Sequence, residues 1–196
     1  MAVTMDQVKR LRELTSAGMM DCKKALKEAG GDIDEAIKLL RQRGKELAQK
    51  KAARSAQAGI VSAYIHHGDK IGVLLEVNCE SDFVAKNEEF KTFAKDIAMQ
   101  IAAASPGYIS RDEVPNDLIE QEKDIFRAQI EGKPEHVIEK IVEGKLEKYY
   151  SSTCLLEQPF IKDQDITMKE LVQDMVAKFG ENIVISRFVR FALGEE

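Results

Sequence analysis

Apolar residues recur every three or four positions between residues 8 and 40, and short glycine-containing breaks interrupt or end the pattern at Gly18, Gly30 and Gly44. This interval places side chains on one face of an α-helix. We therefore predict three short helices, the last of which ends at Gly44. The expected buried stripes are Val8, Leu11 and Leu14; Met19, Cys22, Ala25, Leu26 and Ala29; and Ile33, Ala36, Ile37 and Leu40.

The start of the third predicted helix carries a capping signal. Asp32 precedes Glu35 by three residues, the spacing of a capping-box variant. Residues 45–57, which follow the helix, show no sustained apolar stripe. We therefore expect a solvated helical linker there.

The apolar spacing changes to a period of two near residue 59, which is typical of a half-buried strand. Gly59–His66 and Ile71–Asn78 predict a hairpin that turns at Gly68-Asp69. Helical spacing then returns between residues 90 and 101. The predicted inward positions are Ile71, Val73, Leu75 and Val77 on the strand, then Phe90, Phe93, Ala94, Ile97, Ala98 and Ile101 on the helix.

The remaining pattern predicts more helices and one last strand. Charged stretches 116–131 and 134–150 predict a helical hairpin, 167–179 another helix, and 182–193 a strand. Strands and helices that do not alternate as βαβ units favour an α+β fold with a small antiparallel sheet covered by helices. We expect a three-helix domain over 1–54, which includes the start of the linker, and an α+β domain over 55–196.

Composition limits the class of protein. Hydrophobic residues make up 44% of the chain, which indicates a globular rather than a disordered protein. No apolar run is long enough to span a bilayer, and the N-terminus lacks the features of a signal peptide, so we expect a cytoplasmic protein. The three cysteines, Cys22, Cys79 and Cys154, are odd in number and widely spaced, so we expect free thiols.

Charge is divided unevenly along the chain. Residues 1–54 carry a net charge of +5 and the remainder −10. A basic head can face an acidic partner, but the acidic remainder argues against general nucleic-acid binding, which needs an organised basic surface.

No sequence motif indicates catalysis. Phosphate-binding loops, dinucleotide-binding turns, zinc-protease helices and nucleophile elbows are all missing from the sequence. His66-His67 could bind a metal with Cys79 or Glu80, but adjacent strand residues point to opposite faces. We expect no enzyme activity, no metal, no cofactor and no direct nucleotide binding.

Two apolar features are candidates for protein contact. Asp82-Phe83 lies where the second predicted strand meets the following helix, and Met19-Met20 opens the second predicted helix. An exposed aromatic ring beside a carboxylate could enter a partner's pocket, whereas core packing is the ordinary role of such residues. For the methionine pair, one side chain can pack inward while the other projects, and both protein contact and core filling stay open for Met19.

Two long stretches carry a resemblance to a known family. Leu11-Arg-Glu-Leu-Thr-Ser-Ala-Gly-Met-Met-Asp-Cys-Lys-Lys-Ala-Leu26 and Glu76-Val-Asn-Cys-Glu-Ser-Asp-Phe-Val-Ala-Lys86 resemble the paired signatures of bacterial elongation factor Ts. The likeness extends through the end of the chain and is to the short form found in thermophiles, cyanobacteria and chloroplasts. Ser16 stands where Gly is usual and Ser81 where Thr is usual. Ser81 retains a hydroxyl that can cap a helix.

The resemblance implies a guanine-nucleotide exchange factor for the GTPase elongation factor Tu. It implies a ubiquitin-associated-like three-helix bundle followed by an α+β dimerisation domain. Arg12, Met19 and Met20 would contact the nucleotide domain of the GTPase. Asp82 and Phe83 would enter beside its switch region and disturb the Mg²⁺ site, with Val84 next to them in the same loop.

The resemblance also implies a homodimer that binds two GTPases, with the final strand as an interface element. Some thermophilic relatives carry a Cys near the end of that strand, where this chain has Val189. We therefore expect a dimer that depends on packing rather than on a cross-chain disulfide.

Two other classes stay open. A ubiquitin-associated-type interaction module would bind a partner without affecting nucleotide release. An RNA-binding accessory protein would show steep salt dependence and no requirement for Phe83. Its basic side chains would be Arg41, Arg43, Lys45, Lys50, Lys51 and Arg54.

Overall fold

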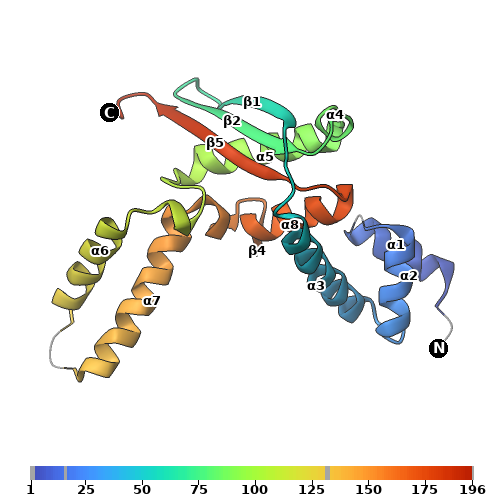
Figure 1. The fold of residues 1–196 in the computed structure, drawn as a ribbon, viewed down its shortest axis with the longest axis horizontal. Helices are drawn as coiled ribbons and strands as arrows, with labels where there is room; N and C mark the ends of the chain where they lie inside the picture. Colours follow the sequence, from blue (N-terminus) through green and yellow to red (C-terminus); the bar gives the residue numbers. More distant parts are fainter. Residues whose placement is uncertain (1–2, 16, 131–132, 196) are drawn as a thin grey trace. The chain divides into compact units, whose positions relative to one another are not determined.

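The structure is a computed structural model that describes residues 3–15, 17–130 and 133–195 (Figure 1). It has an α+β fold, as predicted, with a three-stranded sheet ordered β1-β2-β5 and a short β3-β4 pair. The elements are α1 (Met5–Thr15), α2 (Met19–Glu28), α3 (Ile33–Lys51), β1 (Ala58–Ile65), β2 (Ile71–Cys79), α4 (Asp82–Ala85), α5 (Glu88–Ala104), α6 (Asn116–Ala128), α7 (Glu135–Thr153), β3 (Pro159–Phe160), β4 (Asp163–Thr167), α8 (Met168–Phe179) and β5 (Val184–Ala192).

The chain packs as two compact units. The first contains residues 1–60, 77–91 and 170–186, and the second contains 61–76, 92–169 and 187–196. The N-terminal helices therefore share a unit with the end of β2, with α4 and with most of α8. The domain boundary near residue 54 stays a prediction.

The N-terminal bundle of α1, α2 and α3 closes around the predicted apolar stripes. Its buried core consists of Val8, Leu11, Cys22, Ala25, Leu26 and Ala36. Leu14 was predicted to join this core but is 61% exposed. The half-buried residue at this end of α1 is Thr15 instead. Its Oγ1 donates a hydrogen bond to the Leu11 carbonyl at 2.8 Å.

Helix α3 differs from the prediction at its end. The helix continues through Gly44 to Lys51. Gly44 is buried where α3 packs against α8. A Cβ atom on Gly44 would lie 3.5 Å from the Cβ of Ala177, so the glycine permits close packing rather than a helix stop. At the other end Asp32 caps the helix as predicted and accepts from the Glu35 N–H at 2.9 Å. The Glu35 carboxylate instead receives Lys38 at 3.2 Å.

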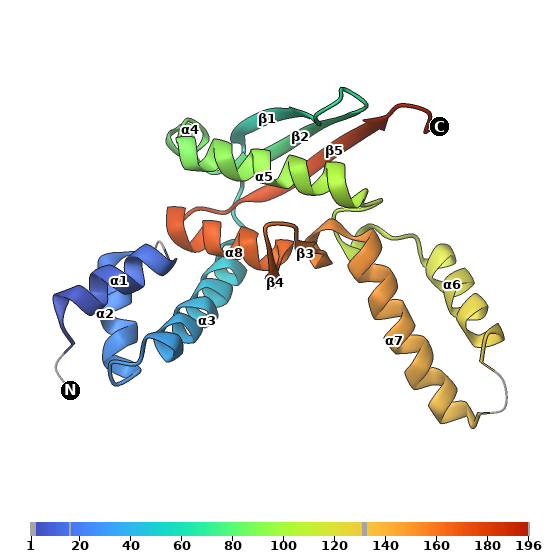
Figure 2. The same cartoon turned by 180° about the vertical axis from the view of Figure 1, so that it is seen from behind.

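The three-stranded sheet is antiparallel and has one covered face. The His66 N–H donates to the Ile71 carbonyl across the predicted hairpin turn, and the Leu193 N–H donates to the Lys70 carbonyl, which sets β5 antiparallel to β2. Figures 1 and 2 show α5 running along one face of the sheet. Val73 and Leu75 are buried, as are the predicted apolar positions of α5.

The opposite face of the sheet exposes several large apolar side chains beside the Glu76–Arg187 ion pair. Within the second unit it carries the large side chains that we call the outer sheet face: Val61, Ile65, Leu74, Val189 and Phe191. Phe191 is 69% exposed and Val61 is 70% exposed. A contiguous set of large apolar side chains on one face is unusual for a surface that only meets water.

Helices α6 and α7 form the predicted hairpin. Val114, Tyr150 and Cys154 form a small buried core at its base. Two predicted features of the hairpin, the helix end at residue 131 and Gly132, lie outside the described residues, as does Ser16 near α1. The β3-β4 pair was missed because β3 has only two residues and begins with a proline.

The three cysteines are free and buried, as expected. Burial raises the pKa of Cys22 and Cys79, and raises the pKa of Cys154 to about 11.

We predict that a thiol reagent at neutral pH modifies the folded protein roughly a hundredfold more slowly than the guanidinium-unfolded chain. Rapid modification of a thiol in the folded protein would contradict this.

The same burial predicts an alkaline effect on stability. The raised pKa of Cys154 means that its contribution is complete below the unfolded pKa of 9.0 and is lost as pH rises toward about 11. Denaturation at a series of alkaline pH values, with Cys154→Ala as the comparison, measures this loss.

Candidate partner-binding surface

Phe83 is the most exposed large apolar side chain among the described residues. It lies in the first turn of α4 and is 89% exposed, and the preceding Asp82 is also exposed. The next two residues, Val84 and Ala85, are only 8% and 5% exposed. The short helix is therefore anchored through Val84 and Ala85 and presents an aromatic ring and a carboxylate outward.

The local sequence explains how the turn forms. Ser81 is the N-cap of α4, and its hydroxyl accepts a hydrogen bond from the Val84 N–H at 3.5 Å. The Ala85 N–H donates to the Ser81 carbonyl at 3.2 Å. That carbonyl also receives the buried thiol of Cys79 at 3.2 Å. The capping role expected of Ser81 is confirmed.

Met19 and Met20 form a second exposed apolar feature. Helix α2 begins at Met19, and its buried face starts one turn later at Cys22. Met19 is 41% exposed and Met20 is 65% exposed. Met19 was predicted on the buried stripe of this helix, and that placement is wrong, because the first turn of α2 extends beyond the bundle core. Both flexible side chains are available to a partner.

Arg12 lies on the exposed side of α1, within a groove of about 370 Å³. The groove is also lined by Glu89, which lies in the first turn of α5, and by Lys178 of α8. Lys178 and Glu89 form an ion pair at 2.9 Å. Because α5 follows α4 directly, this groove brings Arg12 near the segment that presents Phe83.

The first unit thus contains every residue predicted for the surface: Arg12, Met19, Met20, Asp82, Phe83 and Val84. Five of them are exposed. Val84 is buried, so in the free chain it anchors the turn rather than presenting a contact.

Sequence reasoning missed Glu181, whose carboxylate receives the N–H groups of Glu80 and Ser81 at 3.1 and 3.0 Å. Glu181 and Ser81 are 100 residues apart in the sequence. No local motif links the two, so only the folded chain reveals the contact.

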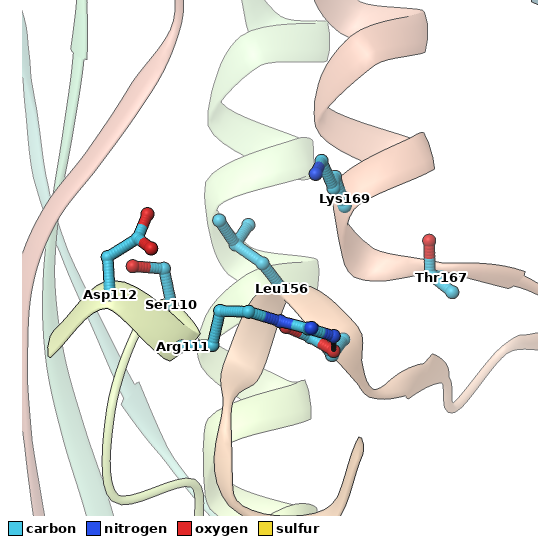
Figure 3. Close-up of a pocket in the computed structure, with 7 residues that line it drawn as sticks. Ser110, Arg111, Asp112, Leu156, Thr167 and Lys169 are labelled. Carbon is cyan, nitrogen blue, oxygen red and sulfur yellow. Dashed lines mark hydrogen bonds and ion pairs between the residues drawn. The ribbon is translucent and has the colours of Figure 1, made fainter. Parts of the chain in front are cut away.

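A cavity in the second unit has a different character. A hollow of about 630 Å³ in the second unit is lined by Ser110, Arg111, Asp112, Leu156, Glu157, Thr167 and Lys169 (Figure 3). The Arg111 guanidinium pairs with Glu147 at 3.0 Å and with Glu157 at 2.5 Å, and it lies 4.7 Å from the centre of the Tyr150 ring. The two carboxylates raise the pKa of Arg111. This arginine therefore serves to hold the base of the α6–α7 hairpin.

The basic residues considered for RNA are largely engaged within the chain. Arg43 pairs with Glu28, Lys45 with Glu170, and Arg54 with Glu80. The Lys51 ammonium donates to the Gly180 carbonyl. These contacts reduce the positive charge that phosphates could meet.

Among the described residues, no helix is long and apolar enough to cross a membrane.

Comparison with known proteins places the chain among the translation elongation factors. The family profile described as "Elongation factor TS" matches residues 1–195. The chain belongs to the elongation factor Ts family.

Individual relatives agree over nearly their whole length. The chain is 62% identical to "Elongation factor Ts" of Carboxydothermus hydrogenoformans, across 98% of this chain and 90% of that protein. It is 60% identical to "Elongation factor Ts" of Thermodesulfovibrio yellowstonii, across 100% and 98%. It is 55% identical to "Elongation factor Ts" of Thermotoga neapolitana, across 100% of both. The family resemblance drawn from the two signature stretches is confirmed.

Proposed function

We propose that this protein releases GDP from elongation factor Tu in the cytosol, so that GTP can bind during translation elongation. One observation carries the proposal beyond family membership: Phe83 is 89% exposed on a turn whose following residues are buried. An apolar ring that stays in water on an anchored turn is suited to a partner's pocket.

In this proposal the α4 turn acts as a wedge. Phe83 enters an apolar pocket beside the switch region of the GTPase, and Asp82 brings a negative charge toward the Mg²⁺ site. Mg²⁺ bridges the phosphate oxygens to the GTPase, so displacing its ligands weakens a strong charge interaction with GDP. The chain itself performs no chemistry on the nucleotide.

This chain and GDP weaken each other's binding to the GTPase to the same extent. If binding of this chain lowers the GDP affinity of the GTPase, GDP lowers the affinity of the GTPase for this chain by the same factor. Each tenfold loss requires about 1.4 kcal/mol. Burial of the Phe83 side chain supplies up to about 1.5–3 kcal/mol. That amount is enough to offset the cost of moving the switch region when the GDP affinity falls by about 10- to 100-fold.

The remaining surface residues supply binding that is independent of the wedge. Met19 and Met20 present flexible apolar side chains, and Arg12 adds a positive charge near the start of α5. We propose that these residues contact the nucleotide domain of the GTPase and hold the chain in place. Val84 contributes by anchoring the turn.

We further propose that two copies of the chain associate through the outer sheet face, so that a dimer binds two GTPases. Large apolar side chains project from all three strands there. A groove of about 300 Å³ runs among Val61, Leu74, Leu75, Glu76, Arg187, Phe188 and Val189. A second copy of the same face would remove these side chains from water.

The dimer proposal predicts that Phe191→Asp yields a monomer. A carboxylate placed within the proposed apolar interface loses its hydration without a partner, which costs several kcal/mol. Sedimentation equilibrium measures the result over a range of concentrations. Ile125→Asp on α6, which is 50% exposed outside this face, is the matched control and should leave association unchanged. A dimer that survives Phe191→Asp would contradict the proposed interface.

The function is tested by release of fluorescent GDP from elongation factor Tu in excess unlabelled nucleotide. Acceleration by this chain supports exchange. Complex formation without acceleration would instead indicate a simple interaction module. Salt-sensitive RNA binding that does not require Phe83 would indicate the RNA-binding class.

A further inference from the structure

An exposed aromatic ring works as a wedge only when its backbone is held in place. Helix α4 has four residues, and so short a helix is unstable by itself in water. The rigidity of the Asp82-Phe83 turn must therefore come from contacts outside α4. Val84 and Ala85 supply buried apolar contacts after Phe83, but the residues before Asp82 need a separate restraint.

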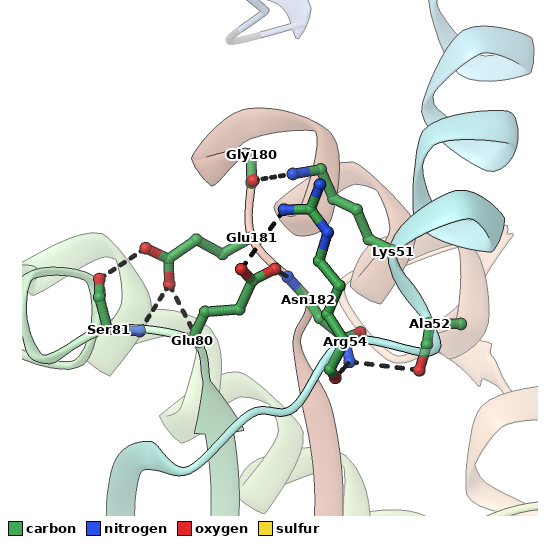
Figure 4. Close-up of polar contacts among 8 residues, drawn as sticks. All are labelled: Lys51, Ala52, Arg54, Glu80, Ser81, Gly180, Glu181 and Asn182. Atoms are coloured by element: carbon green, nitrogen blue, oxygen red, sulfur yellow. Dashed lines mark hydrogen bonds and ion pairs between the residues drawn. The ribbon is translucent and has the colours of Figure 1, made fainter.

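Glu181 supplies that restraint (Figure 4). Its Oε2 accepts hydrogen bonds from the N–H groups of Glu80 and Ser81 at 3.1 and 3.0 Å. Its Oε1 accepts the Ser81 hydroxyl at 2.5 Å. Hydrogen bonds to a carboxylate are stronger than those between neutral groups. One side chain thus fixes two consecutive backbone N–H groups directly before the turn.

The Ser81 hydroxyl transmits this restraint into α4. A hydroxyl has one donor and two acceptor positions. Because its proton goes to Glu181, its lone pairs are oriented to accept the Val84 N–H at 3.5 Å. The cap of α4 and the Glu181 carboxylate therefore form one connected system on both sides of Phe83 in the sequence.

A neighbouring layer of contacts holds Glu181 in place. The Asn182 N–H donates to Glu80 Oε1 at 2.6 Å, and this bond lowers the pKa of Glu80. The side-chain amide of Asn182 donates to the Arg54 carbonyl at 2.8 Å, beyond the end of α3. Lys51 donates to the Gly180 carbonyl. All these residues belong to the first unit, so the loop between α8 and β5 is tied to both α3 and the end of β2.

We propose that Glu181 is a positioning residue for nucleotide exchange: its carboxylate holds the Ser81–Phe83 backbone in the form that presents the wedge. The inference rests on the proposed exchange function. It predicts that loss of the carboxylate lowers the maximal rate of GDP release while the exposed contacts of Arg12, Met19 and Met20 preserve most of the binding.

The experiment compares Glu181→Ala, Glu181→Gln and wild type in GDP release from elongation factor Tu. Glu181→Ala should lower the maximal release rate roughly tenfold and change the half-saturating concentration less than about threefold. Glu181→Gln keeps an oxygen that can accept both N–H groups, so its maximal rate should stay within about threefold of wild type. Glu147→Ala removes a carboxylate that pairs with Arg111 in the second unit, and it should match wild type.

Amide hydrogen exchange in the free protein gives a readout that does not depend on the GTPase. The Glu80 and Ser81 amides should lose protection at least tenfold in Glu181→Ala and should keep it in Glu181→Gln. If Glu181→Ala fails to fold, Ser81→Ala takes its place. It removes the hydroxyl link, keeps both N–H groups, and should also lower the maximal rate more than the binding.

The outcomes separate the inference from the function beneath it. If wild type accelerates release and folded Glu181→Ala keeps the wild-type maximal rate, the positioning role is overturned and exchange stands. Equal losses in the alanine and glutamine variants, or a loss confined to the half-saturating concentration, would also overturn the positioning role. If wild type itself gives no acceleration, the exchange proposal fails, and the positioning role fails with it. A loss of Glu80 and Ser81 amide protection in Glu181→Ala would then mean that the hydrogen bonds to Glu181 stabilise the fold but have no role in exchange.

Discussion

Phe83→Ala is expected to lower the maximal rate of GDP release from elongation factor Tu by roughly 10- to 100-fold. This range corresponds to the loss of about 1.5–3 kcal/mol of apolar burial that is gained only when the ring enters its pocket. Affinity for the nucleotide-free GTPase should fall less, because the contacts proposed for Arg12, Met19 and Met20 are unchanged. The maximal rate and the half-saturating concentration, measured in the same release assay, separate the two effects.

Phe83→Ala should leave the fold of the free chain unchanged. Phe83 is 89% exposed, so its removal should change the free energy of unfolding of the free chain by no more than about 0.5 kcal/mol. Ile125→Ala removes an exposed apolar side chain from α6 in the second unit and is the matched control. Equal losses in release rate and in affinity after Phe83→Ala would rule out a wedge and leave an ordinary contact residue.

The second large effect is expected on stability, from Gly59→Ala in β1. Gly59 has a φ of +151°, and a Cβ atom there would lie 2.3 Å from the Val77 carbonyl oxygen and 2.8 Å from the Asn78 Cα. Both are backbone atoms and cannot turn aside. We expect a loss of about 3 kcal/mol or more, which for a chain of this size lowers the melting temperature by roughly 6–12 °C.

Gly144→Ala is the matched control for that substitution. Gly144 lies in the exposed part of α7, with nothing within 4 Å of the position its Cβ would take. The same change should raise stability by about 0.5–1 kcal/mol, because alanine favours a helix over glycine. Thermal and denaturant unfolding of the two variants measure both signs. Wild-type stability in Gly59→Ala would mean that β1 can move away from Val77 at little cost.

The sequence predicted the elements whose signals are local. The apolar stripes of α1 to α3, the hairpin of β1 and β2 and the stripe of α5 all follow from spacing within about twenty residues. The Asp32 cap depends on a side chain only three residues from its partner. Such features are visible in the chain before it folds.

The errors occurred where distant contacts override local preference. Gly44 was expected to end a helix, but packing against Ala177 uses its lack of a side chain instead. Leu14 and Met19 fit apolar stripes by spacing, yet both lie beyond the edge of the bundle that the stripes enclose. Spacing identifies the inward face of a helix but not the point at which the neighbouring helices stop covering it.

The candidate surface shows the same division. The two signature stretches predicted a set of contact residues by resemblance: Arg12, Met19, Met20, Asp82, Phe83 and Val84. Residue pattern alone could not decide whether Phe83 is core or surface, because exposure depends on what packs over the turn. Glu181 had no sequence signal, since its partners lie a hundred residues away.

The central claim is that this chain catalyses nucleotide exchange through its exposed aromatic turn. The most direct test is stopped-flow release of fluorescent GDP from elongation factor Tu, with a substoichiometric amount of the chain and excess unlabelled nucleotide. The account predicts that each molecule of the chain releases GDP from many GTPases, and that the double variant Asp82→Ala/Phe83→Ala loses this turnover while remaining folded. Release no faster than the spontaneous rate, from a chain that still binds the GTPase, would contradict it.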